Sequence, residues 1–332
     1  MLKKFVIILF FALPSLRAQD MHFTQFYATP MNLNPAFTGA NACSRFSMVY
    51  RNQWPGVATA YKSYLASFDH FSNKHNIGIG LAFGVDESGT GALRTTVINP
   101  AFAYEFKFNH HSMIRFGLQP GFGIKSINFN KLLFGDQIYR GGNVTTVENP
   151  TQTRKFMDIG TGALFTYENY WLGSSFFHLN KPIESLYGDQ SVITPIKYSI
   201  HGGAKYLINK DESYDVNKKY VSFALHYRGQ NEFDQLDLGI YFTKNILNVG
   251  LWYRGIPVLK AYKTGYQNND AVSIIIGMSV ERLNIGYSYD ITISKLSANS
   301  RGAHELTMSY QICKPKKASK IKNRKAVYCP KF

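Results

Sequence analysis

The chain has 332 residues, of which 45% are hydrophobic and 15% aromatic but only 17% charged. Soluble globular domains average about a quarter charged residues, so the composition favours a β-rich protein whose surface is not uniformly in water. The net charge of +16 at pH 7 raises the question of nucleic-acid binding, but the export signal described next argues against a nucleic-acid partner.

The first eighteen residues have the pattern of a secretory signal peptide. Lys3 and Lys4 provide the positive start, an apolar run covers 5–13, and Ala18 ends a usable cleavage site. The run is too short to span a bilayer as a helix. We expect a signal peptide over 1–18. The following segment, 19–42, is expected in the periplasm, where it plugs the lumen, docks a partner, or is an ordered lead-in to the first strand.

Alternation with period two dominates the rest of the chain. In 77–85, Ile, Leu, Phe and Val alternate with Gly and Ala, and in 303–312 apolar and polar residues alternate in the same way. Such alternation indicates strands, and no mature stretch approaches the eighteen apolar residues of a membrane helix. The pattern predicts strands at 44–51, 61–70, 76–85, 93–108, 113–127, 156–166, 170–178, 196–207, 220–230, 235–243, 248–253, 271–280, 283–290 and 303–312.

The connections between these strands alternate in length. Most odd-numbered connections, such as 128–155, 179–195 and 254–270, are long, whereas most even-numbered ones are short. Short periplasmic turns and longer extracellular loops are typical of outer-membrane barrels. We therefore expect an all-β, transmembrane antiparallel barrel of about 14 strands over 43–313, with a Gly-, Ser-, Thr-, Gln- and Asn-rich face lining the lumen. A soluble propeller or sandwich is less favoured, because no blade-length repeat appears.

The last nineteen residues, 314–332, contain eight basic residues and no acidic one. We expect a basic periplasmic tail, which either contacts anionic lipid headgroups or an acidic periplasmic partner, or is simply solvated.

No residue pattern for catalysis is found. The sequence has no nucleophile elbow, zinc-protease motif or P-loop. Gly78, Gly80 and Gly84 lie on one face of an expected strand, and the pair His110-His111 falls in an expected turn without a third ligand nearby. We predict a protein that is not an enzyme and has no cofactor or metal.

Three cysteines in an oxidising compartment leave at least one thiol without an intramolecular partner. Cys43 precedes the first strand and Cys313 ends the last, so closure of the barrel would bring them together. A Cys43–Cys313 disulfide across the seam is one expectation. A Cys313–Cys329 bond within the tail and three free thiols remain the alternatives.

Several short motifs resemble the PorP/SprF family of Bacteroidota outer-membrane proteins. The opening segment resembles the family's start, followed by a signature at the first hairpin, one at the last strand and one at the carboxyl end. The residues that carry the resemblance are Asn34, Pro35, Gly39, Arg51, Asn52, Gln53, Trp54, His304, Glu305, Cys329 and Pro330.

The resemblance implies an integral protein of the cell outer membrane that serves the type IX secretion system. It implies secretion components and secreted adhesin cargo, including gliding-motility adhesins, as partners beside outer-membrane lipid. It transfers no catalytic residue. The sequence itself leaves open an outer-membrane channel or transporter for small solutes, since a polar lumen suits a pore and a plugged barrel equally well.

Overall fold

The computed structural model describes residues 20–41, 43–57, 60–89, 93–129, 132, 135–141, 153–186, 193–208, 219–263, 266–294 and 300–313. The expected signal peptide and basic tail lie outside these residues, as do Cys329 and Pro330.

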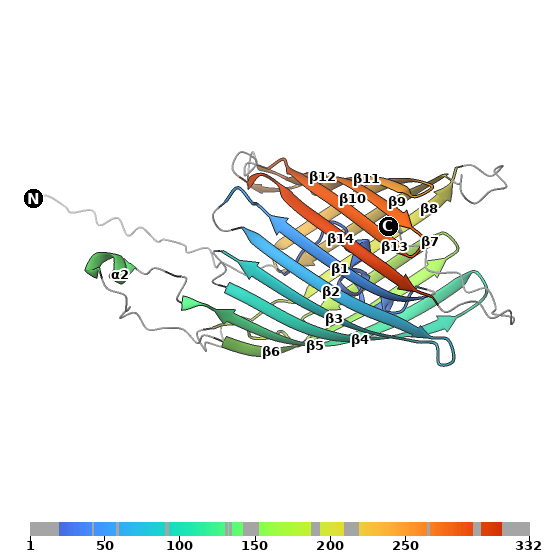
Figure 1. Cartoon of the computed structure of the whole chain (residues 1–332), viewed down its shortest axis with the longest axis horizontal. Coiled ribbons are helices and arrows are strands. Elements are labelled where there is room, and N and C mark those ends of the chain that lie inside the picture. Colours follow the sequence, from blue (N-terminus) through green and yellow to red (C-terminus); the bar gives the residue numbers. More distant parts are fainter. Residues whose placement is uncertain are drawn as a thin grey trace, which may run out of the picture.

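Fourteen antiparallel strands form a closed barrel (Figure 1). Each strand pairs with its neighbours in sequence, and pairing of the first strand with the last closes the barrel. The strands are β1 (Ser44–Gln53), β2 (Tyr61–Ser72), β3 (Ile77–Ser88), β4 (Leu93–Lys107), β5 (Ser112–Ile127), β6 (Thr153–Tyr167), β7 (Tyr170–Phe177), β8 (Lys197–Leu207), β9 (Lys219–Gln230), β10 (Phe233–Lys244), β11 (Leu247–Lys263), β12 (Tyr266–Val280), β13 (Leu283–Thr292) and β14 (Ala303–Ile312).

The expected fold, a transmembrane barrel of about 14 strands, is confirmed. One expected connection is wrong: the long loop at 254–270 is instead the extension of β11 and β12 into a long hairpin. The pairing of β11 with β12 is irregular in this extension, so the sequence there lacks the regular alternation that predicts a strand. The register shifts between Arg254 and Gly255, where Gly255 has a φ of 149°, and a shift of one residue exchanges the two faces of a strand.

The wall has an apolar outside and a polar inside. On β5, Phe116, Leu118 and Phe122 are each about half exposed on the outer face (50%, 52% and 52%), whereas Arg115 on the inner face is completely buried. This is the reverse of a soluble protein, and it suits a wall that meets lipid hydrocarbon. Closure of the barrel also pairs the backbone N–H and C=O groups of the first and last strands, for which lipid offers no hydrogen-bond partners. None of the described helices is long and apolar enough to cross a membrane.

The two ends of the barrel differ. One end, called the turn end below, carries the starts of β1, β3 and β5 and mostly short connections, such as 168–169 and 281–282. The opposite end, called the loop end, carries the connections 128–152 and 178–196. The short helix α2 (Gly135–Arg140) belongs to the first of these and lies beyond the barrel at the left of Figure 1.

Residues 20–41 lie inside the barrel and are called the plug below (Figure 1). They form three short helical pieces, η1 (Phe26–Ala28), α1 (Pro30–Leu33) and η2 (Pro35–Phe37). Residues 20–41 of the segment 19–42 thus lie in the lumen and not in the periplasm, which corrects the expected placement. Of the three roles expected for this segment, the structure has that of a plug. The physical reason is that the barrel wall buries the apolar side chains of this segment and bonds its polar groups.

Candidate functional site: the plugged lumen

Five charged side chains from five strands gather on the inner wall towards the loop end. They are Arg51 on β1, Asp237 on β10, Arg254 on β11, Asp290 on β13 and Glu305 on β14, and they are called the outer ion cluster. Arg51 lies 2.8 Å from Asp290 and 3.1 Å from Glu305. Arg254 lies 3.1 Å from Asp237 and 3.2 Å from Asp290. Because all five are at least 95% buried, each charge depends on the others for compensation.

The plug completes the hydrogen bonding of this cluster. The backbone N–H groups of Thr24 and Gln25 each donate to one oxygen of Glu305, both over 2.7 Å. The Thr24 hydroxyl donates to Asp290 over 2.8 Å and accepts from Arg51 over 2.8 Å. The bonds to Glu305 and Asp290 fasten the plug to residues more than 260 positions away in the sequence.

Aromatic rings fill the middle of the lumen. Phe26 packs edge-on against Trp252 and Tyr27 against Tyr241, with ring centroids 5.0 and 5.3 Å apart. Further down the plug, Phe37 packs against Trp171 at 5.7 Å. These contacts belong to one buried apolar cluster that includes side chains of β6, β7, β9, β10, β11 and β12. A second apolar cluster joins the plug to β1, β2, β3 and β4, so apolar contacts surround the plug on both sides.

Asn34 links the plug to two neighbouring strands. Its amide nitrogen donates to the carbonyl oxygens of Ala163 and Ser174, over 2.9 and 3.0 Å, and lies 3.1 Å from the His201 ring. Its oxygen accepts from the Ala36 N–H over 2.8 Å and so caps η2, which Pro35 begins. A buried side chain that satisfies this many polar groups is expected to fix the path of the plug.

A second polar contact holds the plug towards the turn end. Arg115, paired with Glu105, donates to the backbone oxygens of Ala36 and Thr38. The Gly39 N–H donates to Asp69 over 2.9 Å. Gly39 has a φ of +66°, and a Cβ there would lie 2.7 Å from the His70 oxygen, so the close approach to β2 requires glycine at this position.

The amino end of the plug lies at the loop end. Asp20 is 2.8 Å from His178, which follows β7, and 2.5 Å from Lys197, which begins β8. Burial raises the pKa of Asp20, but Lys197 and His178 outweigh it, so its pKa is lowered overall. Burial lowers the pKa of His178, but the carboxylates of Asp20 and Asp158 outweigh it and raise this pKa to about 9. His178 is therefore cationic at neutral pH.

A disulfide joins Cys43 to Cys313 in the structure, where the plug meets the seam between β1 and β14. The two Cα atoms are 4.7 Å apart, within the range that a disulfide spans.

The family-motif residues fall into two groups. Asn34, Pro35, Gly39, Arg51 and Glu305 meet in the lumen, in or against the plug. Among the other described motif residues, Asn52 and His304 are a register pair on the outer face of β1 and β14, and the His304 ring is 2.8 Å from the Tyr287 hydroxyl. Trp54 packs against Tyr61 beyond β1, while Gln53 accepts from Arg51 over 3.4 Å.

The motifs included only Arg51 and Glu305 among the charged wall residues described above. Asp237, Arg254 and Asp290 of the outer ion cluster, and Arg115 with Glu105, were not singled out. Their signal in the sequence is a charge at a lumen-facing position of a strand whose other face is apolar, as Asp290 is in Leu283–Thr292. A buried charge on the inner face of a barrel needs an oppositely charged partner. The sequence of one strand does not show which residue of another strand provides it.

Solved structures of similar fold are membrane channels and porins. They include the CymD monoaromatic hydrocarbon channel, with 11% identity over 86% of this chain and 93% of that chain and a TM-score of 0.49. The P. putida toluene transporter TodX matches with 11% identity over 84% and 92% and a TM-score of 0.44. The KdgM porin matches with 10% identity over 81% and 99% and a TM-score of 0.33. No curated protein sequence matches the chain.

A family model described as "Type IX secretion system membrane protein PorP/SprF" matches residues 15–310. A closed antiparallel barrel with an apolar outer face is the architecture of integral outer-membrane proteins, and the protein is such a secretion-related outer-membrane barrel. The chain belongs to the PorP/SprF family of type IX secretion system membrane proteins.

Proposed function

We propose that this protein is a non-catalytic, closed platform of the type IX secretion system, which supports the secretion or surface anchoring of cargo such as large adhesins. The observation that carries the proposal is the plug, in a chain that belongs to this secretion family. A barrel whose lumen is occupied by its own amino-terminal segment suits an anchor better than a conduit.

The contacts that hold the plug support a lumen that stays closed. Its polar groups bond to the outer ion cluster, to Arg115 and to Asp69, while its rings pack against the wall between these points. Withdrawal of the plug would remove its hydrogen bonds to buried charged groups such as Glu305, Asp290 and Arg115, at a cost of about 1.5–3 kcal/mol for each bond that is not replaced. A channel or transporter for small solutes, the alternative function, would have to meet that cost each time the lumen opened.

The two ends of the barrel would divide the work. In outer-membrane barrels the longer loops face the exterior, so 128–152 and 178–196 would meet cargo at the cell surface. The turn end would face the periplasm, and Cys313 lies there. The basic tail 314–332 would then contact periplasmic components of the secretion system.

Deletion of the gene tests this function. With a complemented strain as control, mass spectrometry would quantify the proteins secreted and displayed at the cell surface. We expect loss of one large adhesin if the protein serves a dedicated cargo, and loss of many cargo proteins if it serves the whole apparatus. An unchanged surface proteome would contradict the proposal and favour the channel.

A further inference from the structure

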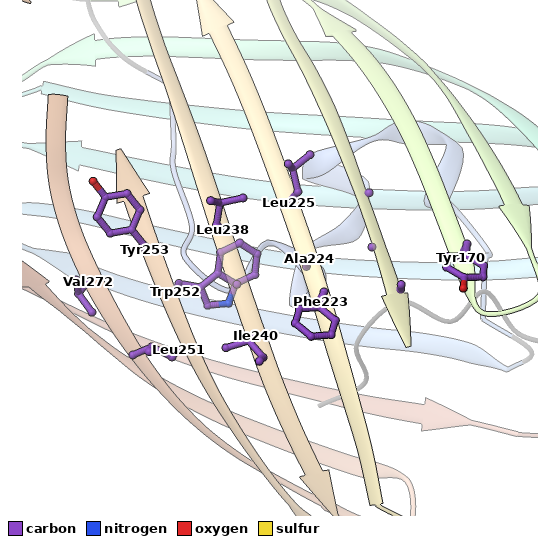
Figure 2. Close-up of a pocket in the computed structure, with 14 residues that line it drawn as sticks. Tyr170, Phe223, Ala224, Leu225, Leu238, Ile240, Leu251, Trp252, Tyr253 and Val272 are labelled. Atoms are coloured by element: carbon purple, nitrogen blue, oxygen red, sulfur yellow. The ribbon is translucent and has the colours of Figure 1, made fainter. Parts of the chain in front are cut away.

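The lipid-facing side of β8 to β12 is hollowed by an apolar groove with a volume of ≈ 780 Å³ (Figure 2). Its floor is the stretch of β8 that contains Gly202 and Ala204, two small residues on a face otherwise covered by large ones. Its rims include Phe223, Leu225, Leu238 and Leu251, which are 39–51% exposed. The volume is within the range of small-ligand sites, and the lining is apolar.

The lower part of the groove, at Phe223 and Ile240, lies in the half of the membrane nearer the turn end. Phe223 is four residues above Lys219, where β9 begins at that end. Four residues of a strand tilted by about 40° rise roughly 10 Å across the membrane, and half of the hydrocarbon layer is about 15 Å thick. The groove is therefore at the depth of the acyl chains of the periplasmic leaflet, if the turn end faces the periplasm.

Two lysines lie below the groove, each separated from it by one outer-face residue, Val221 or Phe242. Lys219 on β9 and Lys244 on β10 are register partners, and by the period of two each shares the outer face with a groove residue, Phe223 or Ile240. Like charges that face each other across two strands are destabilising. An anion held between the two ammonium groups would remove that repulsion.

Tyrosines border the groove near the same level. The Tyr206 hydroxyl on β8 donates to the hydroxyl of Tyr170, which lines the groove, over 3.2 Å. Tyrosines gather where hydrocarbon meets water, so this pair places the lower edge of the groove beside the lipid headgroups.

We propose that this face is a binding site for an anionic phospholipid, with one acyl chain in the groove and the phosphate between Lys219 and Lys244. Two separate observations meet here: an apolar hollow at the depth of the chains, and a paired positive charge at the depth of the phosphate. An acidic protein would account for the lysines but not for an apolar groove that opens towards hydrocarbon.

The test uses the purified full-length mature protein in detergent and native mass spectrometry. Phosphatidylglycerol and phosphatidylcholine with identical acyl chains are the probes: they share the chains and the phosphate, and the headgroup leaves a net negative charge on the first and none on the second. We expect the wild-type protein to bind phosphatidylglycerol more tightly. The double variant Lys219→Gln/Lys244→Gln should weaken this binding about thirty-fold and weaken phosphatidylcholine, whose phosphate is compensated by its own choline, much less. Ala204→Leu, which fills the groove, should weaken both lipids.

Matched variants separate this site from general lipid contact. Lys74→Gln/Lys107→Gln removes two other cations of the turn end, and Ala66→Leu enlarges a small outer-face residue on β2; both should bind as the wild type does. Heat-modified mobility on gels checks that every variant is folded. Equal affinity for the two lipids, or an unchanged affinity in the Lys219/Lys244 variant, would overturn the proposal. Equal losses in the matched variants would do the same.

Discussion

A single residue, Arg51, compensates much of the negative charge in the outer ion cluster. Its guanidinium contacts Asp290, Glu305 and the plug hydroxyl of Thr24. Arg51→Met keeps the length of the side chain but leaves two buried carboxylates short of a cation. We expect the free energy of unfolding to fall by about 3–5 kcal/mol, measured by urea unfolding in lipid vesicles.

The adjacent residue provides the control for Arg51. Asn52 lies on the opposite face of β1, so Asn52→Ala should change the free energy of unfolding by less than about 0.5 kcal/mol. If Arg51→Met unfolded at the same urea concentration as Asn52→Ala, the outer ion cluster would not be a stabilising contact of the plug.

The contact between His178 and Asp20, which fixes the amino end of the plug, depends on pH. The groups that face it are Asp20 of the plug, Asp158 of β6 and Lys197 of β8. Its pKa in the folded protein, about 9, is higher than the value near 6.5 of an unfolded chain. The stabilisation is thus fully present below about pH 6.5 and is lost as the pH rises through about 9.

We therefore expect amide hydrogen exchange around Asp20 to accelerate between pH 7 and pH 10 by more than the intrinsic chemical rate. The variant His178→Gln, which cannot titrate, should lack this additional acceleration. An identical pH profile in the two proteins would show that the histidine does not hold the plug's end.

Among the elements, the strands were predictable and the plug's contacts were not. In a wall with lipid on one side and a filled lumen on the other, apolar and polar or small residues alternate along each strand. The number of strands can therefore be predicted from local sequence. The alternation fails where the backbone bulges, as at Gly255, and there the expected strand ended too early.

The plug lacks such a period, because its short helical turns bury residues on all sides. Family motifs picked out Asn34, Gly39, Arg51 and Glu305, yet their roles depend on partners up to 281 residues away. Only the closed barrel brings these residues together. Local sequence could therefore suggest a plug without identifying what holds it.

As an element, the plug should decide whether the lumen conducts ions. A variant with residues 22–40 replaced by a flexible Gly-Ser linker keeps Asp20 and Cys43 but loses the aromatic layer and the bonds to the wall. A fourteen-stranded barrel without its filling has a lumen wide enough for water. We expect the wild-type protein to be silent in planar bilayers and the variant to conduct. Conductance by the wild-type protein would favour the channel.

At the scale of the whole molecule, the Cys43–Cys313 bond closes a loop with a sequence separation of 270 residues across the barrel seam. A covalent link over so long a loop limits the freedom of the unfolded chain and contributes up to about 5 kcal/mol. We expect one alkylatable thiol, Cys329, in the denatured, unreduced protein. The variant Cys43→Ser/Cys313→Ser should unfold at a lower urea concentration, with Cys329→Ser as the matched control. Three alkylatable thiols would rule out the bond.

The path of the plug places its two ends at opposite ends of the barrel. From Asp20 at the loop end, the chain runs through the lumen to Cys43 at the turn end, and only then enters β1. If the longer loops face outwards, Asp20 lies at the cell-surface end of the lumen, although β1 starts at the periplasmic end. An epitope inserted after Gln19 should bind antibody on intact cells, whereas one inserted in the turn 168–169 should require permeabilised cells. The reverse result would mean that the barrel is oriented with its short turns outwards, and would move the cargo-binding end proposed here to the opposite face.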